Sequence, residues 1–224
     1  MLYVVPTPIG NLEDITLRAL RILKEVELVL AEDTRTSRVL FQKYGIETHL
    51  RAFHAHNEHG VLPQIIAQLQ QGTRMALISD AGTPGISDPG FLLIRACVQH
   101  SVKVECLPGP TAFVPALVAS GIPSDRFHFE GFLPHKKGRH TRLQYLAGLP
   151  HTFVLYESPH RLPRCLEELS NVCGPGRNAC VARELSKLHE TYHRGTLESL
   201  KAHFSTPNTA KGEIVIIVQG FDEN

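Results

Sequence analysis

The fold is decided by residues 75–98, which read M-A-L-I-S-D-A-G-T-P-G-I-S-D-P-G-F-L-L-I-R-A-C-V. The apolar run 75–78 predicts a buried strand, and residues 91–98 have the length and apolar spacing of a helix. Between them, residues 79–90 form a loop rich in glycine and proline. Open α/β sheets bind ligands at such connections, just beyond the carboxyl ends of their strands. The stretch therefore predicts an α/β fold with a ligand site at this loop.

The formal charges in this loop are both negative, on Asp80 and Asp88. Such a loop suits a ligand with positive charge or hydrogen-bond donors better than a phosphate-rich one. Its glycines allow close approach of the backbone, and its prolines stiffen it. The alternative is an ordinary connection in which Asp88 caps the next helix and Pro89 occupies the first helical position. The length of the loop exceeds what a simple connection needs and favours ligand binding.

The composition is that of an ordinary globular protein, with 42% hydrophobic and 20% charged residues among 224. No apolar run reaches the roughly 18–20 residues that span a membrane. The first residues lack the basic region of a signal peptide, so we expect no membrane association. Five cysteines without a C-x-x-C pair indicate a reducing cytoplasm. With a formal net charge of +1, binding of nucleic acid must rest on a local basic patch or on shape.

Strand-like and helical patterns alternate almost from end to end, which predicts a mostly parallel sheet with helices on both faces. The expected strands are 2–5, 28–31, 75–78, 102–106, 127–129, 153–156, 179–182 and 214–218. The expected helices are 16–24, 37–44, 60–70, 91–98, 111–119, 139–146, 161–169 and 198–204. The pattern restarts near residue 124, so we expect two α/β lobes, 1–115 and 116–224, with a hinge near 112–123. A hairpin through 190–196 makes the second lobe partly antiparallel.

Five loops share the character of the loop at 79–90: each follows an expected strand and is dense in glycine, proline or polar residues. They are residues 6–16, 32–35, 79–90, 107–112 and 157–161. In a parallel sheet all five lie on one edge, which predicts a binding site there. The alternative is that Asp33-Thr34 and Ser158-Pro159 simply begin helices.

These loops carry a recognisable set of segments. They read V-P-T-P-I-G-N-L-E-D-I-T-L-R-A-L at 5–20, A-E-D-T-R at 31–35, the loop at 79–90, L-P-G-P-T-A at 107–112, Y-E-S-P-H-R at 156–161 and R-E-L-S-K-L-H-E at 183–190. The ordered set resembles the ribosomal RNA small-subunit methyltransferase I family of the tetrapyrrole-methylase superfamily. Corrin and porphyrin methylases carry a G-x-G-P-G-type first loop, from which P-T-P-I-G-N departs. Many family members also carry a C-terminal extension after their last strand. The present sequence stops soon after the corresponding segment, residues 211–218.

The resemblance implies a cytoplasmic homodimer of two α/β lobes with S-adenosylmethionine in the cleft between the lobes. It implies 2′-O-methylation of a cytidine ribose in the decoding region of small-subunit rRNA, with that rRNA or the small subunit as partner. Two alternatives remain: a methyltransferase acting on a tetrapyrrole or another small acceptor, and a non-catalytic nucleotide-binding module.

The resemblance also implies which residues contact the cofactor. These are Pro8, Ile9, Asp80, Ala81, Gly82, Ile86, Thr111, Ala112, Glu157, Glu213 and Ile214. Thr111 has an alternative role as a helix cap. A carboxylate at the sulfonium would stabilise the charged ground state more than the transition state. We therefore expect Asp80 to lie near the periphery of the cofactor.

Transfer to a ribose hydroxyl would benefit from a general base. We predict a catalytic role for Asp33, Glu184 and Lys187, with His189 and Glu190 as further candidates. A spacing of three places Glu184 and Lys187 on one side of a helix or turn. Lys187 with a lowered pKa could accept the proton, or as a cation it could pair with a phosphate. For each residue the alternative is a solvated salt bridge.

The basic segment 134–142 is the predicted RNA contact, because it concentrates cations without an acid. The predicted RNA-binding residues are Lys136, Lys137, Arg139 and Arg142, extended by Arg35 and Arg161. The alternative is a solvated basic helix start. A separate H-x-H-x-x-H cluster at 54–59 resembles the ligand spacing of a zinc site. It lacks a cysteine partner, so we predict no metal there.

Overall fold

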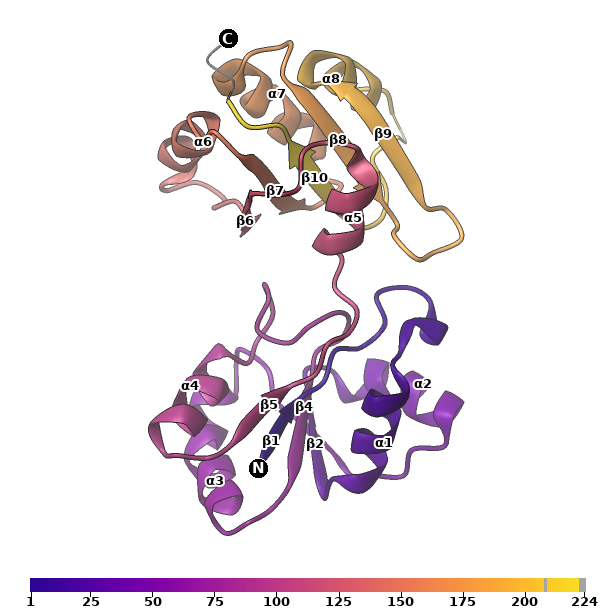
Figure 1. The fold of residues 1–224 in the computed structure, drawn as a ribbon, viewed down its shortest axis with the longest axis vertical. Coiled ribbons are helices and arrows are strands. Elements are labelled where there is room, and N and C mark those ends of the chain that lie inside the picture. The colour runs from indigo at the N-terminus through magenta and orange to yellow at the C-terminus, as the bar shows by residue number, and fades with distance from the viewer. Residues whose placement is uncertain (208, 222–224) are drawn as a thin grey trace. The chain divides into compact units, whose positions relative to one another are not determined.

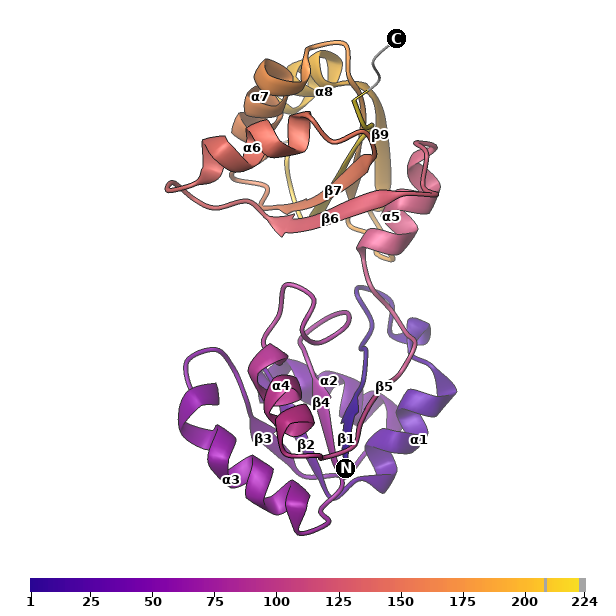
Figure 2. The ribbon, with the colours of Figure 1, turned by 60° about the vertical axis from the view of Figure 1, so that its left-hand side comes forward.

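The computed structural model describes residues 1–207 and 209–221, and the chain divides into two compact units. The first is Met1–Thr111, and the second begins at Ala112 (Figures 1 and 2). The expected boundary at 115/116 falls inside helix α5 (Phe113–Ser120), which packs against strands of the second unit. Each unit is built around its own five-stranded sheet.

The first sheet is parallel throughout, with strand order β3-β2-β4-β1-β5. Its strands are β1 (Leu2–Val4), β2 (Leu28–Ala31), β3 (Leu50–Ala52), β4 (Met75–Ile78) and β5 (Val104–Cys106). Strands β2 and β4 are almost continuously apolar because both faces of the sheet are covered. The predicted parallel sheet is confirmed for this unit.

Helices cover both faces of the first sheet (Figure 1). The helical elements are η1 (Leu12–Asp14), α1 (Leu17–Glu25), α2 (Thr34–Tyr44), α3 (Glu58–Gln70) and α4 (Phe91–Gln99). One core cluster joins α1 and α2 to one face, and another joins α3 and α4 to the opposite face. Because alternate strand residues point to opposite faces, a single strand such as β4 contributes to both clusters.

Side-chain caps explain where α1 and α2 begin. Thr16 accepts from Ala19 N–H, and Asp33 accepts from Arg35 N–H, so α2 begins at Thr34, as the alternative interpretation of Asp33-Thr34 proposes, and not at the expected residue 37. Helix α4 differs from the prediction, because its N-cap is Gly90 (φ 135°) and not Asp88. A Cβ atom at Gly90 would lie 2.9 Å from Leu77 Cδ2, so the loop needs glycine there.

The second sheet is mixed, with strand order β6-β7-β10-β8-β9. Its strands are β6 (Phe127–Phe132), β7 (Thr152–Glu157), β8 (Asn178–Arg183), β9 (Thr191–Thr196) and β10 (Ile214–Val218). Strands β6 and β7 are parallel, whereas β10 runs antiparallel to both β7 and β8. The hairpin of β8 and β9 is antiparallel, which confirms the predicted partly antiparallel second lobe.

Three helices pack on one face of the second sheet: α6 (Arg139–Ala147), α7 (Leu162–Cys173) and α8 (Leu197–Phe204). Helix α5 packs against strands of the same sheet (Figure 2). Among the described residues, no helix is long and apolar enough to cross a membrane.

Candidate functional site

The loops that follow β1 and β4 are joined at the carboxyl edge of the first sheet. Thr7 and Gly82 exchange two backbone hydrogen bonds, each 2.9 Å long, and so form an antiparallel bridge. The buried Thr7 hydroxyl donates to the Ser79 carbonyl at 3.1 Å. The first loop of the chain is therefore fixed against the loop at 79–90.

The loop after β5 packs against the same edge. A Cβ atom at Gly109 would lie 2.8 Å from Pro6 Cβ, so close contact requires glycine at this position. The Thr83 hydroxyl donates to the Pro110 carbonyl at 3.0 Å, which links the β4 and β5 loops. These contacts hold the backbone of several loops close together and leave little room for side-chain substitution.

Four of the five predicted loops thus meet at one edge, because the β2 loop joins them through Asp33. Its N–H donates to Asp80 Oδ1 at 3.0 Å. The fifth loop, 157–161, follows β7 and belongs to the second sheet. The prediction that all five share one edge is wrong for this loop, because the chain begins a separate sheet at β6.

The edge of the first sheet concentrates negative charge at Glu32, Asp33, Asp80 and Asp88. Partial burial raises the pKa of Glu32 and of Asp80, and the charges of neighbouring carboxylates raise both further. Burial, together with the charge of Glu32, raises the pKa of Asp88 to about 6. Carboxyl groups with raised pKa values mark a site where negative charge exceeds its local compensation. Such a site favours a ligand with positive charge.

Asp33 differs from its neighbours because it is already paired. It accepts from Arg35 N–H at 2.8 Å and from Arg35 Nη2 at 2.6 Å. These hydrogen bonds lower the pKa of Asp33 to about 2. The predicted catalytic residue Asp33 and the predicted RNA contact Arg35 therefore bind each other, and Asp33 is a weak proton acceptor.

The other predicted cofactor residues of the first unit differ in exposure. Pro8, Ile9 and Gly82 are buried, Ala81 and Thr111 are half-buried, and Asp80 and Ile86 are exposed. Ala112, the first residue of the second unit, is half-buried. The alternative role of Thr111 as a helix cap is wrong, because Ala112 is the N-cap of α5.

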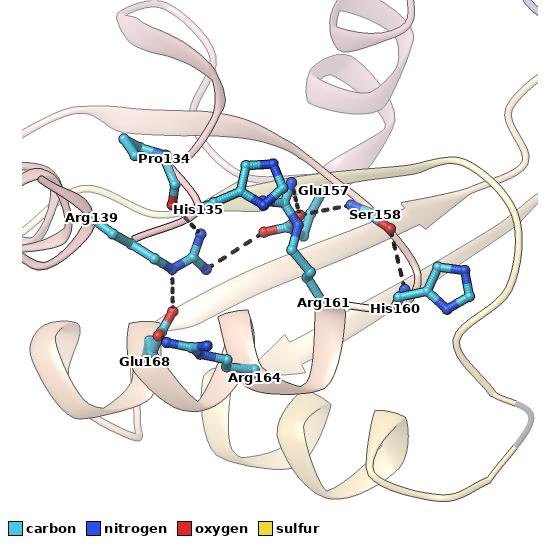
Figure 3. Close-up of polar contacts among 9 residues, drawn as sticks. All are labelled: Pro134, His135, Arg139, Glu157, Ser158, His160, Arg161, Arg164 and Glu168. Carbon is cyan, nitrogen blue, oxygen red and sulfur yellow. Dashed lines mark hydrogen bonds and ion pairs between the residues drawn. The ribbon is translucent and has the colours of Figure 1, made fainter. Parts of the chain in front are cut away.

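A buried ion-pair network follows β7 in the second unit (Figure 3). Glu157 is 3% exposed, and its carboxylate lies 2.7 Å from Arg161 Nη2 and 3.6 Å from Arg139 Nη2. Arg139 is 5% exposed and also donates to Glu168 Oε2 at 2.7 Å and to the Pro134 carbonyl at 3.1 Å. The network fixes the 157–161 loop to the beginning of α6.

This network changes the interpretation of two predicted site residues. Glu157 and Arg139 are buried and paired inside the second unit, so Arg139 holds neighbouring segments together and does not present a free cation. Lys136 and Lys137 are exposed. The Arg142 side chain is 45% exposed and pairs with Glu130. The basic segment therefore presents two lysines to solvent and buries one of its arginines.

A second charged cluster surrounds Lys187. Its Nζ lies 3.0 Å from Glu184 Oε1 and 3.3 Å from Glu213 Oε2. The Glu213 N–H donates to Glu184 Oε1, and this bond and the Lys187 ammonium lower the pKa of Glu184. Burial acts to lower the pKa of Lys187, but hydrogen bonds to the two carboxylates outweigh it and raise that pKa. The lowered pKa considered for Lys187 is therefore not found, and its alternative role as a cation is favoured.

The backbone around this cluster is strained. Glu184 (φ 53°) and Ser186 (φ 62°) both adopt the left-handed conformation that non-glycine residues rarely take. Such strain is concentrated at functional sites in proteins. A Cβ atom at Gly212 would lie 2.2 Å from the Glu184 carboxylate, so glycine leaves space for this carboxylate.

Ile214 brings the two charged groups of the second unit to the same end of the sheet. This buried first residue of β10 faces Glu157 on β7 and Arg183 on β8. The segments Y-E-S-P-H-R and R-E-L-S-K, far apart in the sequence, therefore lie at the same end of the sheet, on either side of β10. The sequence gives no register for β10, so it could not predict this placement.

Within the histidine cluster at 54–59, a ring contact is seen between two of the three histidines. The rings of His54 and His56 lie 6.0 Å apart. Among the residues that the structure describes, no three histidine, cysteine, aspartate or glutamate side chains could hold a metal ion.

Sequence analysis missed Glu32, Arg164 and Glu168. Glu32 lies at the carboxyl end of β2, directly before Asp33, and that position was a usable signal. Arg164 and Glu168 become relevant only through the packing of α7 near α6, which no local motif predicts.

Comparison with known proteins agrees with this architecture. The family model described as "Tetrapyrrole (Corrin/Porphyrin) Methylases" matches residues 1–201. The chain therefore belongs to the tetrapyrrole methylase family. Within it, the chain is 51% identical to a protein of Xylella fastidiosa named "Ribosomal RNA small subunit methyltransferase I", over 98% of this chain and 81% of that protein. It is 52% identical to a protein of the same name from Pseudomonas aeruginosa, over 98% of this chain and 79% of that one.

A solved structure has the same fold at low sequence identity. The uroporphyrin-III C-methyltransferase of Thermus thermophilus, in a structure titled as complexed with S-adenyl homocysteine, is 21% identical with a TM-score of 0.68. The match covers 97% of this chain and 96% of that chain.

Proposed function

We propose that this protein is an S-adenosylmethionine-dependent methyltransferase that methylates the 2′-oxygen of a cytidine ribose in the decoding region of small-subunit rRNA. The observation that carries the proposal is the identity of about half of all positions, over 98% of the chain, to proteins named for small-subunit rRNA methylation. The tight loops and the acidic edge of the first sheet supply independent physical support for the cofactor.

The carboxyl edge of the first sheet fits S-adenosylmethionine. This cofactor carries positive charge on its sulfur and on its amino group, and Glu32, Asp80 and Asp88 form a region of excess negative charge. Gly82 and Gly109 let the backbone approach closely, which suits a ligand bound by main-chain groups. We assign cofactor contact to the loops at 6–10, 79–90 and 107–112, with exposed Asp80 binding amine donors.

The bound cofactor supplies an activated methyl group that the ribose oxygen accepts. This displacement depends on alignment of the reacting atoms, so positioning by the protein provides much of the rate. Rigid attachment of Thr7 to Gly82, and of Thr83 to Pro110, keeps the cofactor loops in place. These contacts preorganise the site without any direct role in the chemistry.

We assign to Lys187 the contact with the ribose hydroxyl that accepts the methyl group. Its ammonium is held between Glu184 and Glu213 and stays charged because its pKa is raised. A cation beside a hydroxyl favours the deprotonated oxygen, as does any opposite charge placed near an acid. Lys187 therefore stabilises negative charge that develops on the ribose oxygen, and Glu184 positions Lys187. The hydroxyl proton passes to solvent water as the new O–CH3 bond forms and the S–CH3 bond of the cofactor breaks. Asp33, already paired with Arg35, is assigned to the stability of α2.

RNA binding is assigned to the exposed lysines of the basic segment, Lys136 and Lys137, with the partly exposed Arg142 beside them. Such contacts hold the phosphate backbone and carry no sequence information. Arg139 contributes by fixing this segment.

We also assign a homodimer in the cytoplasm, as the family resemblance implies. Leu188 is 93% exposed, and Val118 on α5 is also exposed. Single exposed apolar side chains are common on monomers, so the assignment rests on the family resemblance. Analytical ultracentrifugation of the purified protein should give twice the monomer mass, and a monomer would refute the assignment.

The function is tested by methyl transfer from labelled S-adenosylmethionine to purified small ribosomal subunits, with nuclease mapping of the product. We expect label on a cytidine 2′-oxygen. Label on base carbons, or label on a tetrapyrrole but not on RNA, would refute the proposal. Calorimetry with the cofactor alone separates an enzyme from a nucleotide-binding module, since the module would not bind it.

A further inference from the structure

A pocket of about 270 Å³ lies between α6 and α7 in the second unit. Lys136 and Arg139 line it from the α6 side, and Arg164, Glu168 and Asn171 line it from α7. The residues on α7 recur at intervals of four and three, so they form one face of that helix. The pocket is therefore a groove between two helices, with charged groups on both walls.

The walls of this pocket carry more positive than negative charge. Glu168 is its acid, and both carboxylate oxygens are occupied: Arg139 Nε lies 2.7 Å from one, and Arg164 Nε lies 2.9 Å from the other. Arg139 is also paired with buried Glu157, so the exposed Lys136 and Arg164 supply the positive charge that the lining offers to a ligand. The imidazole rings of His135 and His140 also line the pocket.

Helix α6 begins beside this pocket, because Arg139 and His140 of its first turn line the pocket. Gly138 is the N-cap (φ 82°) and has no side chain to cap the first turn, which also contains no acid. The unsatisfied N–H groups of a helix N-terminus attract anions. The pocket thus combines side-chain cations with main-chain donors, the combination that proteins use to bind phosphate.

We propose that this pocket binds a backbone phosphate of the substrate RNA through the exposed cations Arg164 and Lys136, with buried Arg139 as a positioning residue. The inference rests on the proposed function for the identity of the RNA. It goes beyond the basic segment because it assigns α7, through Arg164, to RNA binding. Lys137, which follows the pocket residue Lys136 in the chain, is also exposed, so a polyanion can contact more positive charge here than a free phosphate does.

The test replaces Arg164, whose side chain is 70% exposed, by alanine. Arg21→Ala is the matched control, because Arg21 pairs with Glu25 four residues later on an exposed helix face of the first unit, as Arg164 pairs with Glu168. Binding of a labelled small-subunit rRNA transcript is measured over a series of KCl concentrations. We expect R164A to weaken binding roughly three- to ten-fold and to reduce the salt slope by about one, with R21A unchanged.

A second variant adds a positive charge to the pocket, and its expected gain in RNA binding could not result from loss of structure. Asn171, an exposed residue of the pocket, is replaced by lysine. N171K should tighten RNA binding and steepen its salt dependence. Salt slopes equal to that of the wild type in both R164A and N171K would overturn the proposal.

NMR spectra of His135 and His140 distinguish the source of the phosphate. We expect the RNA transcript to shift both imidazole signals in the wild type and R164A to reduce these shifts. Shifts with inorganic phosphate but none with RNA would overturn the proposal, as would no shift with either. Failure of the proposed function is seen separately, because the wild type would then transfer no methyl group to small subunits whatever the salt slopes.

Discussion

The edge of the first sheet and the end of the second sheet treat charge in opposite ways. In the first unit, burial and mutual repulsion raise the pKa values of Glu32, Asp80 and Asp88. In the second unit, hydrogen bonds from basic or backbone groups lower the pKa values of Glu168 and Glu184 despite their burial. The first region keeps negative charge available for a ligand, and the second satisfies its acids internally. The two arrangements suit the cationic cofactor and the anionic substrate of the proposed function.

Loss of the Lys187 ammonium is expected to have the largest effect. Lys187→Ala should reduce kcat on the order of 10²–10³-fold, as does removal of a group that stabilises developing charge. Lys187→Arg should retain part of the activity because it keeps the cation. Single-turnover methyl transfer measures kcat, and calorimetry should show unchanged cofactor affinity. Equal loss in the alanine and arginine variants would argue against an electrostatic role.

The close approach of Gly212 to Glu184 gives the next test. Gly212→Ala adds a Cβ atom 2.2 Å from the Glu184 carboxylate and strains a residue at φ 77°. Gly121→Ala is the control, because Gly121 has the same φ and nothing within 4 Å of its Cβ position. We expect G212A to reduce kcat roughly ten- to a hundred-fold and G121A to affect stability alone. Similar activities in the two variants would show that the position of Glu184 is unimportant.

In the first unit, the corresponding test is Gly109→Ala. The added Cβ atom would lie 2.8 Å from Pro6 Cβ, and overpacking of this kind costs about 1–3 kcal/mol. Cofactor affinity should fall with stability, since both depend on the same loops. Gly176→Ala, which meets nothing within 4 Å, is the control. Calorimetric cofactor binding and thermal unfolding measure the two effects, and full cofactor affinity in G109A would contradict the assignment of these loops.

The pH dependence of cofactor binding tests the role of the acidic edge of the first sheet without a mutation. Asp88, with a pKa of about 6, gains a proton as the pH falls through that value, and the negative charge of the edge decreases. A cationic ligand binds better to the ionised form, so S-adenosylmethionine affinity should fall below about pH 6. Calorimetry from pH 5 to 8 tests this. Affinity that rises on acidification would refute a cation site at this edge.

The smallest expected effect concerns stability. The folded-state pKa of Asp88 lies above its value of 3.8 in the unfolded chain, so the native state binds its proton more tightly. Ionisation of Asp88 therefore destabilises the fold as the pH rises through about 6, and acidification removes this cost. Asp88→Asn should stabilise the protein on the order of 1 kcal/mol at pH 8, after allowance for solvent screening. Thermal unfolding at pH 8 and pH 4 should show a gain only at the higher pH.

Much of the fold was predictable because its strands have strong local patterns. The apolar runs 28–31, 75–78 and 214–218 match β2, β4 and β10 at both ends. Strand β3 was missed because Leu50–Ala52 is short and only half-buried, and so carries little periodicity. Asp88 was misjudged as a helix cap because an Asp-Pro pair is a strong local signal, whereas Gly90 is required by its contact with Leu77.

The site was predictable where its residues follow parallel strands, because the order of elements alone brings the loops after β1, β2, β4 and β5 together. It was unpredictable where charges pair across helices. The sequence presents Arg139 as one of several basic residues, and its burial depends on the position of Glu168 one helix later. The register of β10, which places Glu157 and Arg183 on either side of Ile214, likewise depends on long-range strand pairing.

The position of β10 in the second sheet has a consequence for synthesis. This strand lies between β7 and β8 but follows every other strand in the chain. The first sheet has all five of its strands once residue 106 has emerged from the ribosome, so the first unit can fold early. The second sheet lacks its centre until residue 218 has emerged, and β6–β7 and β8–β9 wait as two separate pairs. An enzyme proposed to modify ribosomal RNA thus completes its second sheet only after β10 has been synthesised.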